Sequence, residues 1–292
     1  MSSRWEVPIS RDLIPVINEA LGDRYTIERE IARGGAGRIF LAHDAEDRKI
    51  ALKILHPELT VSVQADRFLR EIELLSRLEH PLIAKLLDYG ERDWVVYFAM
   101  SYVEGPTLQA VLDQVRRTSV ADALRLGDNL LDALAYAHSQ GIVHRDVKPA
   151  NIILADAGAM LVDFGIARAI EMAGRQRITH SGFTVGTSTY MSPEQAAGLP
   201  TIDHRSDLYS LGCVLYECLA GRPPFSHRLE AVVIQLQQSE PPPDVRLFRP
   251  DVPEALAEAL LKAMAKRPEE RWQTAAAMRA AMGRSTHPAS QA

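Results

Sequence analysis

The chain has 292 residues, a formal net charge of −5 and two cysteines. This length is enough for a domain with a substantial core, and the negative charge gives no electrostatic reason to expect nucleic acid as a partner. We recognise no signal peptide and no apolar run of the ~20 residues that a membrane span needs, and the two cysteines suit free thiols in a reducing compartment, so we expect a cytoplasmic location and no membrane segment.

Residues 1–24 are predicted to form an N-terminal extension. Its apolar residues are spaced as on one face of a short helix, which could dock on the domain that follows; they are Leu13, Val16, Ile17, Ala20 and Leu21. Pro15 counts against this helix, because proline disrupts helix interiors.

A strand followed by a glycine-rich turn is predicted next. Residues 25–31 alternate β-branched and polar side chains, and the turn occupies residues 32–40. Gly34 and Gly37 would let the backbone turn tightly and bring its N–H groups close to phosphate oxygens, where a Cβ atom would obstruct. Such a turn alone is weak evidence, and an ordinary hairpin is the alternative.

One lysine is embedded in the apolar strand predicted at residues 50–55. An ammonium group in such a run is costly unless it reaches a rim or finds a partner. The helix predicted at residues 68–78 carries Glu71 within its apolar stripe. We therefore expect Lys53 to pair with Glu71, the alternative being two exposed charges that never meet.

Two further elements lead to a polar loop. Residues 95–105 are predicted as an apolar strand that ends in a Gly-Pro turn. From residue 120 onward leucines recur at helical spacing, and Gly141 is a typical helix terminator, which predicts a long amphipathic helix over residues 120–141. Residues 152–154 and 160–162 then form a predicted hairpin.

The loop between that helix and the hairpin, residues 144–151 with the sequence HRDVKPAN, carries reactive side chains. Asp146 can accept a proton from a hydroxyl nucleophile, and Lys148 can neutralise charge on a phosphoryl group in transit. Asn151 before the hairpin and Asp163 after it offer the hard oxygen ligands that Mg²⁺ prefers. Phosphoryl transfer depends mainly on positioning and electrostatic stabilisation, so these side chains predict a site for that reaction.

In this order the motifs resemble those of the bacterial eukaryotic-like (Hanks-type) serine/threonine protein kinases. The resemblance rests on residues 144–151, on Asp-Phe-Gly at residues 163–165 and on Met-Ser-Pro-Glu-Gln at residues 191–195. Lysine two residues after the catalytic aspartate, followed by Pro-x-Asn, is typical of the serine/threonine class. The resemblance covers the chain from Tyr25 to Met282.

The resemblance implies an α+β, bilobal protein kinase fold. The small N-lobe would be mainly antiparallel β with one key helix and would span residues 25–104. The larger, mainly α-helical C-lobe would span residues 105–282, and residues 283–292 would form a disordered tail.

A nucleotide site is implied as well. Lys53 would hold the α- and β-phosphates of ATP, and Glu71 would fix Lys53. Met100 would be the gatekeeper, and backbone groups of Tyr102 and Val103 would hydrogen-bond the adenine. The other implied nucleotide-binding residues are Ile31, Gly34, Gly37, Ile39, Ala51 and Ile153.

The resemblance makes the polar segment between residues 163 and 192 an activation loop. Its candidate phosphorylation sites are Thr179, Ser181 and Thr184. A phosphate there could pair with Arg145 and order the loop, whereas a loop that is never modified is the alternative. Thr187 would support the incoming substrate beside the catalytic aspartate and lysine.

Three residues farther along would have structural roles. Residues 207–221 are nearly apolar all round and too short for a membrane span, which predicts a buried core helix. By resemblance, Asp207 in this helix would brace the catalytic loop, and Arg271 would pair with Glu194.

The implied activity is transfer of the γ-phosphoryl group of ATP to serine and threonine hydroxyls of proteins, with Mg²⁺, or Mn²⁺ in its place, as the metal. Autophosphorylation of the activation loop is implied too, for which two copies could associate. The alternative is a pseudokinase scaffold, hinted at only by Ala32 and Ser192, which replace the family's glycine and alanine. Lys148 and the long loop argue against a small-molecule kinase. The chain is either a free-standing kinase or the catalytic domain of a longer protein.

Overall fold

The structure is a computed structural model, which describes residues 13–34, 37–56, 72–93, 95–164 and 188–283. Two compact units make up the chain. We call them the sheet unit, residues 1–62 and 87–102, and the helical unit, residues 63–86 and 103–292. The first holds a five-stranded sheet and the second most of the helices. The predicted α+β class, with a small antiparallel β part and a larger helical part, is confirmed.

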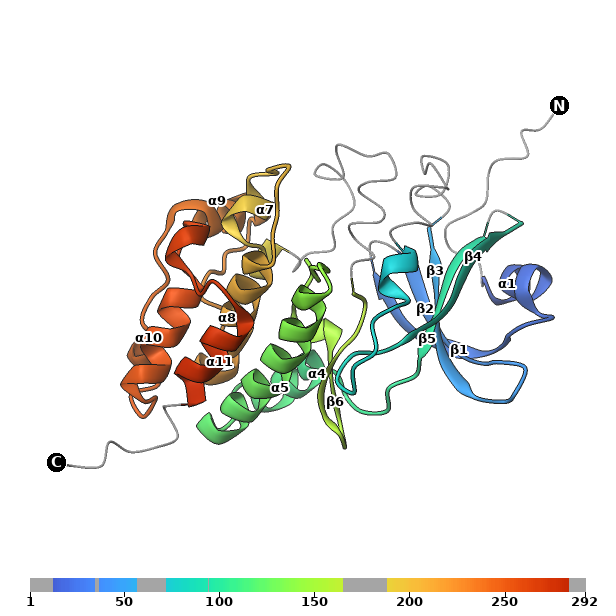
Figure 1. Cartoon of the computed structure of the whole chain (residues 1–292), viewed down its shortest axis with the longest axis horizontal. Coiled ribbons are helices and arrows are strands. Elements are labelled where there is room, and N and C mark those ends of the chain that lie inside the picture. Colours follow the sequence, from blue (N-terminus) through green and yellow to red (C-terminus); the bar gives the residue numbers. More distant parts are fainter. Residues whose placement is uncertain (1–12, 35–36, 57–71, 94, 165–187, 284–292) are drawn as a thin grey trace. The chain divides into compact units, whose positions relative to one another are not determined.

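The sheet unit combines helix α1 with a sheet in the strand order β1-β2-β3-β5-β4 (Figure 1). The bounds are α1 Ile14–Leu21, β1 Thr26–Gly34, β2 Gly37–His43, β3 Lys49–Leu55, β4 Leu86–Arg92 and β5 Val95–Ser101. Strand β2 pairs antiparallel with β1 and β3, and β3 pairs antiparallel with β5.

Helix α1 covers one face of this sheet. Its buried residues Ile17 and Leu21 lie in one apolar cluster with Phe40, Leu52 and Tyr97 of the strands. The helix forms in spite of a proline because that proline occupies the first turn, where its missing N–H has no helical partner to lose. The short helix that the apolar spacing suggests is therefore present, and its apolar side is part of the unit's core.

Residues 72–75 of the helical unit are helical, and its remaining regular structure follows the Gly-Pro turn. Its elements are α4 Leu108–Val115, α5 Val120–Ser139, η1 Pro149–Asn151, β6 Ile152–Ala155, β7 Gly158–Leu161, η2 Ser188–Tyr190, α7 Pro193–Ala196, α8 Arg205–Ala220, α9 Glu230–Ser239, η3 Val245–Leu247, α10 Glu254–Ala263, η4 Pro268–Glu270 and α11 Ala275–Gly283. The predicted long helix is α5, which starts at the cap residue Ser119 and stops before Gly141, whose φ is 73°. The predicted hairpin is the antiparallel pair β6–β7.

Helix α8 is buried along almost its whole length, as predicted. It packs against α5 and α10 (Figure 1). The thiols of Cys213 and Cys218 lie on this helix, and burial raises the pKa of both to about 12. A buried thiol that stays protonated is a poor nucleophile, so these cysteines are packing residues.

The segment before β4 also belongs to the core of the helical unit. Leu75, Leu78, Leu82 and Ile83 lie in its apolar cluster. The expected small lobe, residues 25–104, includes this segment, but the structure groups it with the helical unit because its leucines pack there.

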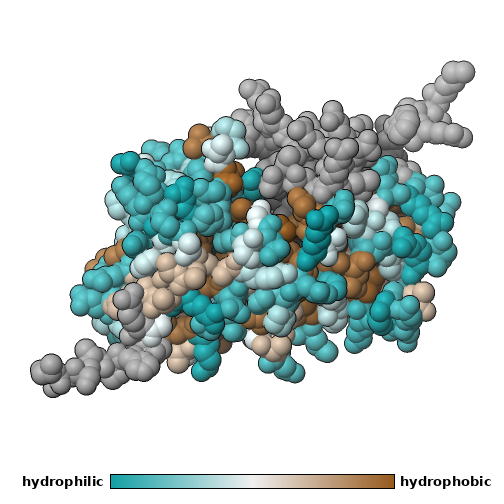
Figure 2. All heavy atoms as spheres, viewed as in Figure 1, coloured by the Kyte–Doolittle hydropathy of each residue, from teal (hydrophilic) through white to brown (hydrophobic). Residues whose placement is uncertain are grey.

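Hydrophilic residues cover most of the described surface on the face shown in Figure 2, with apolar residues scattered among them. Most of the buried apolar residues gather instead in two clusters, one in each unit. None of the helices in the described ranges is long and apolar enough to cross a membrane.

Candidate active site

The sheet face opposite α1 carries four of the predicted nucleotide-binding residues. Ile39 of β2 lies opposite Lys53 of β3, and Ala51 of β3 lies opposite Met100 of β5. Their neighbours along each strand belong to the α1-covered core, so the alternation of side chains places these four on the other face. The register thus groups one amine with three apolar side chains.

Lys53 is only 8% exposed. A buried ammonium group is costly unless an opposite charge or hydrogen-bond acceptors compensate it. Its expected partner, Glu71, lies outside the described residues. The Lys53–Glu71 pair therefore stays a prediction.

The two described glycines of the β1–β2 turn have different surroundings. Gly34 faces Gly37 across the turn. A Cβ atom on Gly37 would lie 2.1 Å from the carbonyl oxygen of Ile54 on β3, whereas a Cβ atom on Gly34 would meet no atom of the described residues within 4 Å. Close approach of β3 therefore requires Gly37, a reason that differs from the phosphate contact expected from the sequence.

The remaining predicted nucleotide-binding residues are distributed over both units. Ile31 is half-buried at a register shift of the β1–β2 pairing. Tyr102 is the last residue of the sheet unit, and the buried Val103 is the first of the following part of the helical unit. Ile153 of β6 forms an isolated antiparallel β-bridge with Thr107.

The carboxylate of Asp146 is held by two side chains of its own loop. Lys148 Nζ lies 2.8 Å from Asp146 Oδ2. Asn151 Nδ2 donates to the same oxygen at 2.9 Å and to the Asp146 carbonyl at 2.8 Å. The Asp146 side chain keeps 28% of its surface exposed, so it is oriented and still accessible to a hydroxyl group.

The β6–β7 hairpin brings Asn151 and Asp163 to the same end. Ile152 pairs with Leu161, and the Val162 N–H donates to the Asn151 carbonyl at 3.0 Å. Asp163 follows with a φ of 63°, a left-handed conformation that is uncommon outside glycine. Because Asn151 donates its side-chain N–H to Asp146, its side-chain oxygen can serve as a ligand with the Asp163 carboxylate. This donor set fits a hard divalent cation.

His144 connects the loop to the hairpin through its ring. Its Nδ1 accepts the Asp146 N–H at 3.2 Å, so the ring proton lies on Nε2, which donates to the Val162 carbonyl at 3.0 Å. The ring is buried and lies 4.4 Å from the Phe164 ring, centroid to centroid. His144 thus supports the loop as a neutral imidazole.

Asp207 of α8 braces the loop from the interior, as expected. Its carboxylate accepts the backbone N–H of His144 at 2.8 Å and that of Arg145 at 2.7 Å, and His138 Nε2 donates to it at 2.8 Å. Burial alone would raise the pKa of this carboxyl, but these donors hold it below the ordinary value. The loop backbone is thus fixed by a buried anion.

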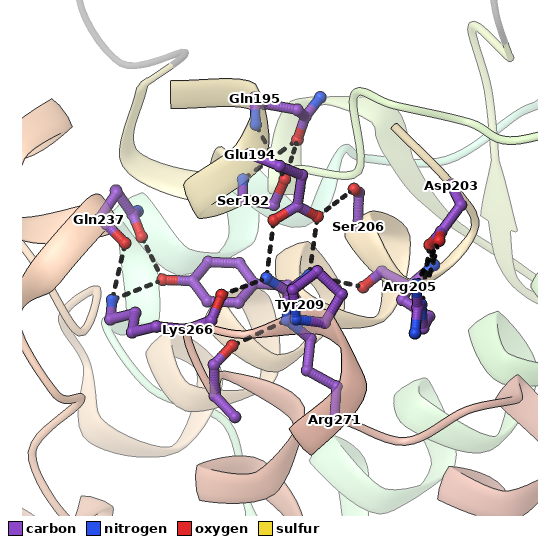
Figure 3. Close-up of polar contacts among 12 residues, drawn as sticks. Ser192, Glu194, Gln195, Asp203, Arg205, Ser206, Tyr209, Gln237, Lys266 and Arg271 are labelled. Carbon is purple, nitrogen blue, oxygen red and sulfur yellow. Dashed lines mark hydrogen bonds and ion pairs between the residues drawn. The ribbon is translucent and has the colours of Figure 1, made fainter. Parts of the chain in front are cut away.

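The expected pair of Glu194 with Arg271 is confirmed (Figure 3). The two side chains form two parallel bonds in the interior of the helical unit. Ser206 donates to the same carboxylate. These contacts join α7 to the start of α8 and to the segment between η4 and α11 that carries Arg271.

Ser192 and Gln195 have a structural role that was not predicted from the sequence. Ser192 caps α7: its hydroxyl accepts the Gln195 N–H at 3.4 Å, and Gln195 Oε1 accepts the Ser192 N–H at 3.1 Å. This reciprocal arrangement is a capping box, for which S-x-x-Q is a recognised pattern. That spacing is visible in the sequence, so Ser192 is better explained as a helix cap than as a sign of lost activity.

Several predicted residues lie outside the described part of the chain. These are Glu71, Thr179, Ser181, Thr184 and Thr187. The Arg145 guanidinium, expected to meet a phosphate, donates to the Ile202 carbonyl at 3.2 Å.

Comparison with known proteins agrees with this geometry. The model of the protein kinase domain matches residues 25–281. A probable serine/threonine-protein kinase of Streptomyces coelicolor is 40% identical over 268 residues, which are 89% of this chain and 39% of the relative. Serine/threonine-protein kinase PknB of Mycolicibacterium smegmatis is 41% identical over 89% of this chain and 42% of its own length. Serine/threonine-protein kinase PrkC of Bacillus subtilis is 40% identical over 91% of this chain and 41% of its own length. The chain thus spans about two fifths of these relatives.

Proposed function

Because this chain belongs to the protein kinase domain family, we propose that it transfers the γ-phosphoryl group of ATP to serine and threonine hydroxyls of proteins. The observation that carries this proposal is the Asp146 carboxylate, which is accessible and held by both Lys148 and Asn151. Proton acceptor, cation and oxygen ligand thus meet within one short loop, which is what phosphoryl transfer requires.

The sheet unit would supply the lysine and most of the apolar side chains of the nucleotide site. Lys53 would hold the α- and β-phosphates of ATP, because its ammonium group shares a sheet face with apolar side chains suited to a base. Met100 would be the gatekeeper, whose side chain limits access to the nucleotide site on that face. Backbone groups of Tyr102 and Val103 would bond the adenine, and Glu71 would fix Lys53.

The helical unit would supply the catalytic groups. Asn151 and Asp163 would hold a divalent metal ion, Mg²⁺ or Mn²⁺, which supplies positive charge for the phosphates when bound. Asp146 would orient the substrate hydroxyl and accept its proton. Lys148 would stabilise the negative charge of the phosphoryl group during transfer.

Serine and threonine are the proposed acceptors because the loop carries Lys-Pro-Ala-Asn after its aspartate, and the names of the relatives give the same class. We further propose phosphorylation of this chain itself at Thr179, Ser181 or Thr184, with two copies associating for the transfer. Thr187 would support the substrate. A cytoplasmic location stays a prediction.

The test is incubation of the purified chain with ATP and Mg²⁺, followed by intact mass, site mapping and assay on a generic protein substrate. Asp146→Asn is the matched control, because it keeps the size of the side chain and removes the proton acceptor. We expect added phosphate on serine or threonine that is absent from the control. Intact ATP binding with no transfer to itself or to the added protein would favour the scaffold alternative and contradict the proposal.

A further inference from the structure

The peptide plane between Arg145 and Asp146 is bonded at both of its polar groups. On one side the Asp146 N–H donates to His144 Nδ1 at 3.2 Å. On the other side the Arg145 carbonyl accepts from Gln195 Nε2 at 2.7 Å. A peptide group is planar, so bonds at its N–H and C=O together fix its orientation, and the Asp146 side chain projects from the end of this plane.

The backbone conformation of Arg145, which precedes this plane, is unfavourable in the absence of other contacts. Arg145 has a φ of 66°, in the left-handed region that costs a non-glycine residue about 1 kcal/mol or more. Such a conformation persists only where surrounding contacts determine it. Asp207 fixes the N–H of Arg145 and Gln195 fixes its carbonyl. Without the second contact, this peptide group could rotate more freely.

Gln195 is well placed to hold the carbonyl, because its side chain is itself fixed. Its Oε1 accepts the N–H and the hydroxyl of Ser192, both at 3.1 Å. These bonds leave its Nε2 directed at the Arg145 carbonyl. The neighbouring Glu194 anchors α7 through Arg271 (Figure 3). The amide thus extends from a rigid helix start to the catalytic loop.

We propose that Gln195 is a positioning residue: through its bond to the Arg145 carbonyl it holds the peptide plane that aims the Asp146 carboxylate. This inference rests on the proposed phosphoryl transfer, in which Asp146 acts on the substrate hydroxyl. Gln195 itself touches neither substrate nor nucleotide in this role.

Two substitutions separate this positioning from the cap. Gln195→Glu retains an oxygen for the Ser192 N–H, since glutamate is the other usual capping-box residue, but it has no N–H for the Arg145 carbonyl. Ser192→Ala does the opposite: it removes the cap hydroxyl but keeps the Gln195 amide and the Ser192 N–H, which still donates to Gln195 Oε1 and orients it. Gln195→Met removes the amide without adding a charge and controls for repulsion by the new carboxylate.

For peptide phosphorylation we expect kcat to fall about tenfold in Gln195→Glu and in Gln195→Met, as for loss of one well-placed bond to a buried acceptor. The KM for ATP should not change. Ser192→Ala should keep kcat within about twofold and lower the melting temperature by about 3 °C. Amide hydrogen exchange at residues 145–147 should accelerate in both Gln195 variants and not in Ser192→Ala.

Wild-type kcat and wild-type exchange in the Gln195 variants would overturn the inference while the proposed function stands. If the wild-type protein transfers no phosphate, the proposed function fails instead. The exchange comparison then still decides whether Gln195 holds the loop, because it needs no turnover.

Discussion

Glu194 and Arg271, 77 residues apart in the chain, form a buried ion pair with bonds of 2.8 and 2.7 Å. Every N–H of the Arg271 guanidinium has an acceptor, because the carbonyls of Ala265, Lys266 and Arg205 take those that Glu194 does not. A buried pair of this kind is stable only when its remaining donors are satisfied. It therefore joins α7 to the segment between η4 and α11.

We predict that Glu194→Gln lowers the free energy of unfolding by about 3 kcal/mol at neutral pH, because it leaves the Arg271 charge buried without its counter-ion. Urea denaturation of the two proteins measures this difference. Glu258→Gln, a substitution of the same type at an exposed position within α10, is the control and should change stability by less than about 0.5 kcal/mol.

The Glu194–Arg271 pair also predicts that the free energy of unfolding depends on pH. Burial opposes the charge of Glu194, but the bonds from Arg271 outweigh it and hold the pKa below its ordinary value of 4.5. The pair therefore contributes fully above pH 4.5, and its contribution is lost as the pH falls through the lower pKa of the folded state. The difference between wild type and Glu194→Gln should shrink below pH 4.5. A difference that stays constant under acid would contradict this prediction.

The two glycines of the β1–β2 turn provide a matched comparison. Gly37→Ala should destabilise the sheet unit by about 1–3 kcal/mol, because the new methyl group would overlap the Ile54 carbonyl. Gly34→Ala has open space and should change stability by less than about 1 kcal/mol. Thermal unfolding of both variants checks the pair. Equal losses would mean that the approach of β3 is not what requires Gly37.

Helix α1 should contribute to the stability of the sheet unit, although it precedes the residues that match the kinase domain model. Ile17 is 1% exposed in the core beneath the helix, so Ile17→Ala should cost about 2–5 kcal/mol. Glu19→Ala, on the exposed side of the same helix, should be close to neutral. A chemical denaturation series on the two variants measures this, and a neutral Ile17→Ala would show that α1 contributes nothing to the core.

Substitutions of two carboxylates of the helical unit, Asp163 and Asp146, should differ in their effect on metal-dependent ATP binding. Asp163→Ala should abolish transfer and weaken the Mg²⁺ dependence of ATP binding, because it removes a proposed metal ligand. Asp146→Asn should abolish transfer as well but keep metal-dependent binding. Calorimetric titration of ATP with and without Mg²⁺ distinguishes them, and wild-type turnover in Asp163→Ala would refute the proposed mechanism.

Local patterns in the sequence predicted much of this molecule. Helix α5 and the β6–β7 hairpin follow from spacing and turn residues, and the burial of α8 follows from its apolar composition. The grouping of catalytic side chains in the loop was also predictable. Asp146, Lys148 and Asn151 lie within one short segment, so they stay close together in space whatever the fold around them. The cap on α7 was visible too, as S-x-x-Q, and was overlooked.

Contacts between distant segments were decided by the tertiary structure alone. The need for glycine at residue 37 comes from the carbonyl of Ile54 on another strand, and the bond from Gln195 to the Arg145 carbonyl joins a helix start to a loop 50 residues away. A sequence reports which side chains are available and their local periodicity. It does not report which backbone atom a folded neighbour brings within 3 Å, because that depends on the packing of the whole unit.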